Sequence, residues 1–258
     1  MLKFSKNVDL TNSLLLLSFT SAGLTGNFAS SILINNHNFE SIGFFFSHYL
    51  CPYVGKNPGS GGLLFNGQAY FNQDQKILLL NFHAGVPHHF RNEFASELLT
   101  LFSGNSMRGI IIYGGIGKNF LNDEELRLKE VSVYYLTNDK SFSGQNFGVK
   151  NFETLVNLEN KKKFLEEVQY LDRCGVAKHL IKFFSKKNVT FHYFFAFSSE
   201  LFDPLAGLAL YYKISNILGF TQDGGVSVPK AVDNLNDFLD TVEKQFKIES
   251  TWRLFLKE

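Results

Sequence analysis

The hydrophobic pattern divides the chain into short apolar segments and segments of helical periodicity. A continuous apolar run is typical of a strand that is buried on both faces of a sheet. We predict strands at residues 14–19, 42–46, 68–71, 76–82, 109–113, 131–136 and 189–197. The polar residues Asn72-Gln73-Asp74-Gln75 between two of these runs predict a hairpin turn.

Between the strands, apolar residues recur at the spacings of an amphipathic helix. Such segments lie at residues 27–33, 90–102, 176–184 and 205–218. Pro87 stands where the first turn of the second helix is expected, and Asp203-Pro204 supplies a cap and a first-turn proline for the fourth. Strands therefore alternate with helices along the chain.

This alternation predicts an α/β fold, a three-layer sandwich with helices on both faces of one central sheet. The hairpin adds antiparallel pairing, so the sheet is predicted to be mixed. No break in composition marks a second domain, and we expect residues 1–258 to form a single domain that ends in a C-terminal helical extension and tail at 228–258. The seam of this helix is Val232, Leu235, Leu239, Val242 and Phe246. It either docks on the domain or meets a partner helix.

Composition and charge exclude several classes of protein. Of the 258 residues, 45% are hydrophobic and 19% are charged, so a sizeable core can form. The formal net charge of +1 gives no field that would attract nucleic acid or an anionic membrane. The longest apolar run, at 205–212, is far shorter than the about 18 residues of a membrane-spanning helix. We therefore expect no binding to nucleic acid and no insertion into a membrane.

Two residue types bear on compartment and partners. Cys51 and Cys174 form neither a disulfide framework nor a zinc motif, which indicates a reducing compartment. Cys51, which precedes Pro52, is predicted to be buried and inert. The chain contains 29 Phe, which reflect either an AT-rich genome or an aromatic recognition surface.

Three motifs suggest chemistry without completing a site. Gly23-Leu24-Thr25-Gly26 follows a strand and opens a helix, where either a phosphate binds or, as we favour, strand and helix pack tightly. Gly114-Gly115-Ile116-Gly117-Lys118-Asn119 lacks the first glycine and the final hydroxyl of a P-loop, and we predict a plain loop. His83, His88 and His89 lack metal-ligand spacing and are expected at the surface or at a cap. The sequence predicts no catalytic, cofactor-binding or metal-binding residues.

Several motifs, taken in order, resemble one family. They are Ala22-Gly23-Leu24-Thr25-Gly26 leading to Ile32-Leu33, Ile42-Gly43-Phe44-Phe45-Phe46, Leu50-Cys51-Pro52-Tyr53-Val54-Gly55-Lys56-Asn57-Pro58, Asp172-Arg173-Cys174-Gly175-Val176-Ala177-Lys178 and Ser250-Thr251-Trp252-Arg253-Leu254-Phe255. Together they make the chain similar to the proteasome assembly chaperone family. The Val-Gly-x-Asn-Pro and Trp-Arg-Leu pieces are the most specific.

The resemblance implies a nucleoside-phosphorylase-like fold without an active site, and hence a non-enzymatic chaperone that needs no cofactor. It also implies a heterodimer with a sister member, proteasome assembly chaperone 1, which holds the α-subunits of the 20S proteasome during α-ring assembly in the cytoplasm and nucleus. Two other functions stay open. One is a nucleoside or phosphate-ester hydrolase or phosphorylase with an anion site at Gly23 to Gly26, and the other is a scaffold for a different partner.

The tail holds the candidate partner-binding residues, which are Trp252, Leu254, Phe255, Leu256, Lys257 and Glu258. An apolar tail is unusual, because free chain ends are mostly polar. Either Trp252 and Leu254 pack back on the domain, or residues 255–258 extend and place the terminal carboxylate in an α-subunit pocket. The resemblance implies a hydrophobic-Tyr-x ending. Since Lys257 stands at the tyrosine position, the α-ring contacts are expected mainly from the sister subunit.

Overall fold

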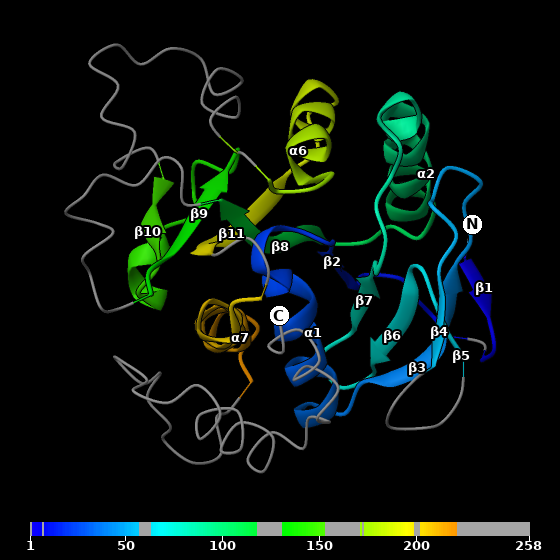
Figure 1. The fold of residues 1–258 in the computed structure, drawn as a ribbon, viewed down its shortest axis with the longest axis horizontal. Coiled ribbons are helices and arrows are strands. Elements are labelled where there is room, and N and C mark those ends of the chain that lie inside the picture. Colours follow the sequence, from blue (N-terminus) through cyan, green and yellow to red (C-terminus); the bar gives the residue numbers. More distant parts are fainter. Residues whose placement is uncertain are drawn as a thin grey trace.

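A computed structural model describes residues 2–6, 8–56, 63–117, 131–152, 171, 173–198 and 202–220, with Leu2, Phe4 and Lys56 described by their backbone alone. The strands of its large sheet are β1 (Leu2–Phe4), β2 (Leu14–Ser18), β3 (Glu40–Phe45), β6 (Gln68–Asn72), β7 (Ile77–Asn81), β8 (Gly109–Gly117), β9 (Val133–Thr137), β10 (Lys150–Asn151) and β11 (Phe191–Ser198). Within the described ranges they form a 9-stranded sheet in the order β1-β3-β6-β7-β2-β8-β11-β9-β10 (Figure 1). A separate pair consists of β4 (Val54–Lys56) and β5 (Leu63–Phe65).

The sheet is mixed, as predicted. Its centre, β7-β2-β8-β11, is parallel, whereas β6, β3 and β1 pair antiparallel on one side and β9 pairs antiparallel with β11 on the other. The predicted hairpin between β6 and β7 is confirmed, and the Gln75 amide donates a hydrogen bond to Asn72 Oδ1 at 2.8 Å. Parallel strands in the centre are buried on both faces, which explains their continuous apolar sequence.

Helices cover both faces of the sheet (Figure 1). The helices α1 (Thr25–Asn36) and α7 (Pro204–Ile217) pack on one face, and α2 (Arg91–Gly104) and α6 (Ala177–Lys186) on the other. Strand β2 serves both cores, because Leu15 and Leu17 point to one and Leu16 to the other. The predicted three-layer α/β sandwich is therefore confirmed.

The start of α7 follows its sequence signals, whereas α2 begins at Arg91, beyond the first turn that Pro87 predicted. The Asp203 side chain accepts a hydrogen bond from the Ala206 amide at 3.1 Å, and Pro204 stands in the first turn of α7, as predicted. A short 3-10 turn, His88–Phe90, lies between Pro87 and α2.

None of the helices in the described part of the chain combines the length and apolar character that crossing a membrane requires.

Two strand predictions were wrong. A loop was expected from Gly114 onward, but β8 continues to Gly117, because glycine lets the strand pass close to the backbone of the first helical turn. Residues 42–46 were expected to be buried on both faces, but Phe44 is half-buried and Phe46 is 42% exposed.

Three features predicted from the sequence lie beyond what the structure tests. The C-terminal helix and tail at 228–258, including Trp252, Leu254, Phe255, Leu256, Lys257 and Glu258, fall outside the described residues. The single-domain assignment of 1–258 and the nucleoside-phosphorylase-like character of the fold stay predictions.

Candidate protein-interaction surface

An α/β sheet usually binds small ligands beyond the carboxyl ends of its parallel strands, where two neighbouring strands continue in opposite directions. Here β2 and β8 meet this condition. The chain continues from β2 through α1 to β3 on one side of the sheet, and from β8 to β9 on the other. The Gly23–Gly26 turn follows β2, so this point is where an active site would be expected.

The backbone fills this point. A Cβ on Gly115 would lie well inside van der Waals contact distance of the Ala22 carbonyl oxygen, and one on Gly26 would lie 2.9 Å from the carbonyl oxygen of Tyr113. The Gly115 amide donates a hydrogen bond to Ser21 Oγ at 2.9 Å. Strand and helix therefore pack backbone to backbone, which is the interpretation of the glycine motif that we favoured.

The turn also carries a group that opposes anion binding. The Asp203 amide donates a hydrogen bond to the Gly23 carbonyl at 3.0 Å, and Asp203 Cβ lies 2.9 Å from the position of a Cβ on Gly23. The residue packed on this turn therefore carries a carboxyl group, and its negative charge disfavours a phosphate. Gly23 itself has φ +64°, which favours glycine.

The histidines and cysteines do not assemble a reactive site. His88 and His89 are exposed before α2, in agreement with the sequence interpretation. Among the residues with described positions, no three His, Cys, Asp or Glu lie close enough to hold a metal ion. Cys174 is buried, but Cys51 is half-exposed, so its predicted burial was wrong. The chain leaves the core at Cys51 to form β4.

The open surface lies at the β1–β3 side of the sheet and begins in β3. A bulge between Ser41 and Gly43 breaks the alternation of this strand, so that Ile42 and Phe45, three residues apart, both reach the same core. Phe44 points to the opposite face of β3, and Phe46, which follows the last residue of β3, is 42% exposed. Two aromatic rings thus lie outside that core.

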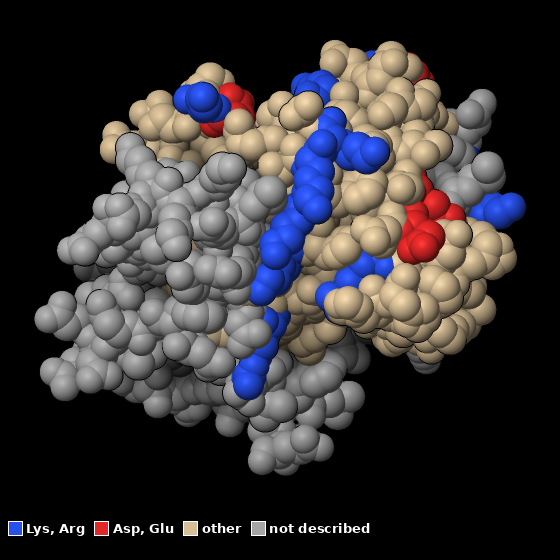
Figure 2. Space-filling model, turned by 90° about the horizontal axis from the view of Figure 1, so that it is seen from above, with Lys and Arg blue, Asp and Glu red and all other residues tan. Residues whose placement is uncertain are grey.

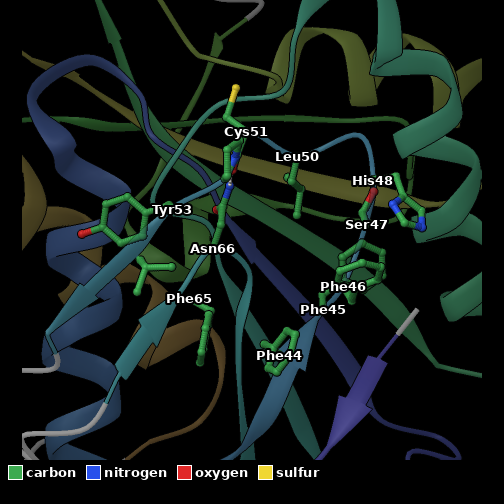
Figure 3. Close-up of a pocket in the computed structure, with 12 residues that line it drawn as sticks. Phe44, Phe45, Phe46, Ser47, His48, Leu50, Cys51, Tyr53, Phe65 and Asn66 are labelled. Carbon is green, nitrogen blue, oxygen red and sulfur yellow. Dashed lines mark hydrogen bonds between the residues drawn. The ribbon is translucent and has the colours of Figure 1, made fainter.

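The pair β4–β5 packs beside these rings. Phe65 of β5 stacks on Phe44 with ring centroids 5.0 Å apart. Between the two elements lies a pocket of about 290 Å³ (Figure 3). It is lined by Phe44, Phe45, Phe46, Ser47, His48, Leu50, Cys51, Pro52, Tyr53, Val54, Phe65 and Asn66. This lining contains no Asp, Glu, Lys or Arg.

Asn66 holds the rear of the pocket in place. Its Nδ2 donates to the Cys51 carbonyl at 2.9 Å and to the Ala84 carbonyl at 3.3 Å, and its Oδ1 accepts from the His83 and Ala84 amides at 3.0 and 3.2 Å. The Asn66 amide donates to the Tyr53 carbonyl at 3.3 Å. Because one buried side chain joins two loops through four hydrogen bonds, the pocket is preorganised.

His83 packs against this wall of the pocket, so its predicted place at the surface or at a cap was wrong. His83 stacks on Tyr53 with ring centroids 5.5 Å apart, and its Nε2 has no hydrogen-bond partner among the described residues. Desolvation by burial lowers the pKa of His83 to about 4, so the ring is neutral at pH 7.

Large apolar side chains at this site are exposed. They are Phe46 at 42%, Tyr53 at 37%, Val54 at 65% and Leu63 at 65%. We call these four residues, with Phe44 and Phe65, the apolar surface. Exposed aromatic groups around a rigid, uncharged pocket are typical of the centre of a protein–protein interface.

The sequence reasoning did not name this surface. The signals were present, since the aromatic triplet at 44–46 and the stretch at 50–58 both contributed to the family resemblance, and the abundance of Phe admitted an aromatic recognition surface. The candidate residues chosen were instead those of the tail.

A filled crevice and an open apolar surface define an α/β protein suited to contact with another protein chain. The chain belongs to the PAC2 family, whose sequence model matches residues 15–237. The family resemblance carried by the motifs is therefore confirmed.

Curated relatives and solved structures agree with this assignment. Proteasome assembly chaperone 2 of Homo sapiens is 24% identical over 272 residues, covering 95% of this chain and 92% of that protein. The mouse protein of that name is 29% identical over 125 residues, so this match spans 46% of this chain and 47% of the mouse protein.

Two archaeal structures share the fold. Pyrococcus furiosus PbaA, an archaeal homolog of proteasome-assembly chaperone, has a TM-score of 0.65 at 16% identity, and the match covers 96% of this chain and 97% of PbaA. PbaB, an archaeal proteasome activator from the same organism, has a TM-score of 0.65 at 13% identity with the same coverage.

Proposed function

We propose that this protein is a non-enzymatic proteasome assembly chaperone. Membership of the PAC2 family and the similarity to proteasome assembly chaperone 2 support this role. The crevice at Gly115, filled by backbone, supports a function without catalysis. The proposed role places the protein in the cytoplasm and nucleus.

The proposed partner is proteasome assembly chaperone 1, bound through the apolar surface. The observation that carries this assignment is the exposure of Phe46, Tyr53, Val54 and Leu63 around an uncharged pocket. Apolar groups of this size gain most when a partner removes them from water. The heterodimer then holds α-subunits of the 20S proteasome while the α-ring assembles.

Phe46→Ala tests the pairing. Its matched control is Phe147→Ala, because Phe147 is a half-buried phenylalanine beside β10, at the opposite edge of the sheet. Size-exclusion chromatography with light scattering, on each variant mixed with purified proteasome assembly chaperone 1, measures the heterodimer. We expect Phe46→Ala to weaken pairing at least about tenfold, as hot-spot truncations do, and Phe147→Ala to leave it unchanged. Equal pairing by both variants would remove the apolar surface from the proposal.

The role itself has a separate test. Affinity purification of the tagged chain, followed by mass spectrometry, is expected to recover the sister chaperone and 20S α-subunits and to lack mature β-subunits. Recovery of neither would overturn the chaperone function.

A thermal-shift panel of nucleotides and phosphate esters is expected to give no stabilisation. A ligand that stabilises the wild-type chain would favour the enzyme alternative.

We propose a second contact at the tail, which lies outside the described residues. Trp252 and Leu254 anchor the tail on the domain, while Phe255, Leu256, Lys257 and Glu258 reach an α-subunit pocket. Deleting residues 255–258 is then expected to preserve folding and pairing and to weaken α-ring capture. Trp252→Ala is expected to lower the melting temperature, because emptying a buried aromatic site costs about 3–5 kcal/mol. Unchanged α-ring capture after the deletion would leave only the packing role.

A further inference from the structure

A row of lysines lies along α6. The apolar side chains Leu180, Ile181 and Phe184 are buried in the core. Lys178, Lys182 and Lys186 follow one another at intervals of four residues, so they lie on one face of the helix, one turn apart. Lys178 and Lys182 are half-exposed, and Lys186 is exposed.

The start of α2 adds further positive charge. The two helices touch where His179 Nε2 of α6 lies 2.9 Å from Asn92 Oδ1 of α2. Burial lowers the pKa of His179, and the nearby Arg91, His88, Lys182 and Lys186 lower it further. Arg91 directly precedes Asn92, so the contact between His179 and Asn92 places the first residue of α2 beside α6. We call Arg91, Lys182 and Lys186 the basic stripe.

The stripe lies on the side of the molecule that α2 and α6 form. From above, Lys and Arg side chains of the described residues form a line across the molecule, and the described Asp and Glu side chains in the same view lie apart from it (Figure 2). Within the described part of the chain, the ion pair of Lys6 with Glu40 is elsewhere, and neither Lys182 nor Lys186 pairs with a carboxylate.

This arrangement is unfavourable for the helix on its own. Like charges four residues apart repel each other and destabilise a helix. The chain as a whole has a formal net charge of only +1, so the stripe is a local concentration of charge that the composition does not require. A carboxylate-rich surface brought against it would convert repulsion into attraction.

We propose that the basic stripe is a second docking surface and binds an acidic segment of a protein partner, with carboxylates about one helical turn apart. It is distinct from the apolar surface, which lies at β3, β4 and β5, whereas the stripe lies on α2 and α6. An acidic polypeptide fits better than nucleic acid. Non-specific binding to nucleic acid depends on the number of phosphates that cations neutralise, and the stripe offers only a short row of cations.

A binding assay on the full chain alone tests the proposal. The probe is a fluorescent helical peptide with glutamates at intervals of four, and its binding is measured by fluorescence anisotropy at low and at physiological ionic strength. We expect saturable binding that weakens as salt rises, because salt screens exposed charges. Because no sister chaperone is present, failure of this assay leaves the proposed pairing untouched.

The double variant Lys182→Glu/Lys186→Glu is expected to weaken peptide binding at least about tenfold. The matched control, Lys76→Glu/Lys140→Glu, changes the net charge equally at exposed sites outside the stripe and is expected to leave binding within about twofold. Lys182→Glu alone replaces repulsion by attraction along α6. Its melting temperature is therefore expected to be unchanged or higher while binding weakens, an effect that loss of folding cannot produce.

Three outcomes would overturn the proposal. They are no binding of the acidic peptide at low ionic strength, equal weakening by the stripe and control variants, and tighter binding of a single-stranded oligonucleotide of the same charge. The last result would assign the stripe to nucleic acid.

Discussion

Two regions of this chain differ in packing: one crevice is filled by backbone, and one pocket is not filled. At the carboxyl ends of β2 and β8, where an α/β sheet usually leaves a crevice, Gly26 and Gly115 let backbone meet backbone. At the β1–β3 side of the sheet, the rings of Phe44 and Phe65 stack on each other and line a pocket that no side chain fills. The fold has closed its usual ligand site and opened a surface elsewhere.

The two regions depend on different structural features. The crevice depends on the absence of side chains, so any addition there is costly. The pocket depends on side chains whose outer atoms contact solvent and on one buried residue, Asn66, behind them. Substitutions at the first region therefore act on folding, and those at the rim of the second act on binding.

Gly115→Ala is expected to give the largest effect. The added Cβ collides with the Ala22 carbonyl oxygen and lies 2.7 Å from Thr25 Oγ1, and the free energy of unfolding should fall by at least about 3 kcal/mol. Gly104→Ala, the control, meets nothing within 4 Å at the end of α2 and should be neutral or stabilise by about 0.5 kcal/mol. Urea denaturation of both variants measures the difference, and a folded, equally stable Gly115→Ala would refute the filled crevice.

Two neighbouring aromatic residues, the last residue of β3 and the one that follows it, sharpen the comparison. Phe45 is 1% exposed and Phe46 is 42% exposed. Phe45→Ala should lower the free energy of unfolding by about 3–5 kcal/mol, whereas Phe46→Ala should lower it by less than about 1 kcal/mol. Chemical denaturation checks both values. Similar losses for the two variants would mean that Phe46 serves the core and not the surface.

Asn66→Ala is expected to lower both the folding stability and the affinity for the sister chaperone. The variant leaves the Cys51 and Ala84 carbonyls and the His83 amide without their bonds to the side chain, at an expected loss of about 2–3 kcal/mol. Because the rear of the pocket loosens, pairing should also weaken even though the apolar residues remain. Calorimetric titration with the sister chaperone, below the melting temperature of the variant, measures this, and unchanged affinity would show that the pocket needs no rigid support.

The smallest effect concerns pH. An unfolded histidine has a pKa of about 6.5, whereas burial lowers that of His83 to about 4. Between these values the unfolded state binds more protons. The contribution of neutral His83 is therefore complete above about pH 6.5 and is lost as the pH falls towards 4.

At pH 5 this loss amounts to about 1–2 kcal/mol. His83→Phe keeps a ring against Tyr53 but does not titrate, so its stability should fall less than that of the wild type between pH 7 and 5. Denaturation at both pH values compares the two proteins. Parallel losses would assign the acid sensitivity to other groups, such as His179 and His192, whose pKa values burial also lowers.

Local signals in the sequence predicted most of the fold. Asp203-Pro204 and the residues around Asn72 carry their own cap and turn, and the central strands are apolar on both faces. Such features depend on neighbours in sequence, and the structure has them within a residue or two of the predicted positions.

Local sequence signals could not predict the apolar surface. The run at 42–46 looks like a buried strand, and only its bulged pairing with β6 decides that Phe46 is exposed. The strands β4 and β5 are too short for a periodic pattern. In the same way, the extension of β8 to Gly117 depends on a contact between Gly115 and Ser21, which are far apart in the sequence.

An exposed apolar surface also sets a limit on how much unpaired chain a cell can tolerate. Val54 and Leu63, each 65% exposed, would be covered in a heterodimer but would meet water or another copy in any surplus molecule. Exposed apolar patches beside sheet edges promote self-association. If the proposed heterodimer forms, synthesis of this chain is expected to be matched to that of the proposed partner, and overproduction of this chain alone should yield aggregates that co-expression removes.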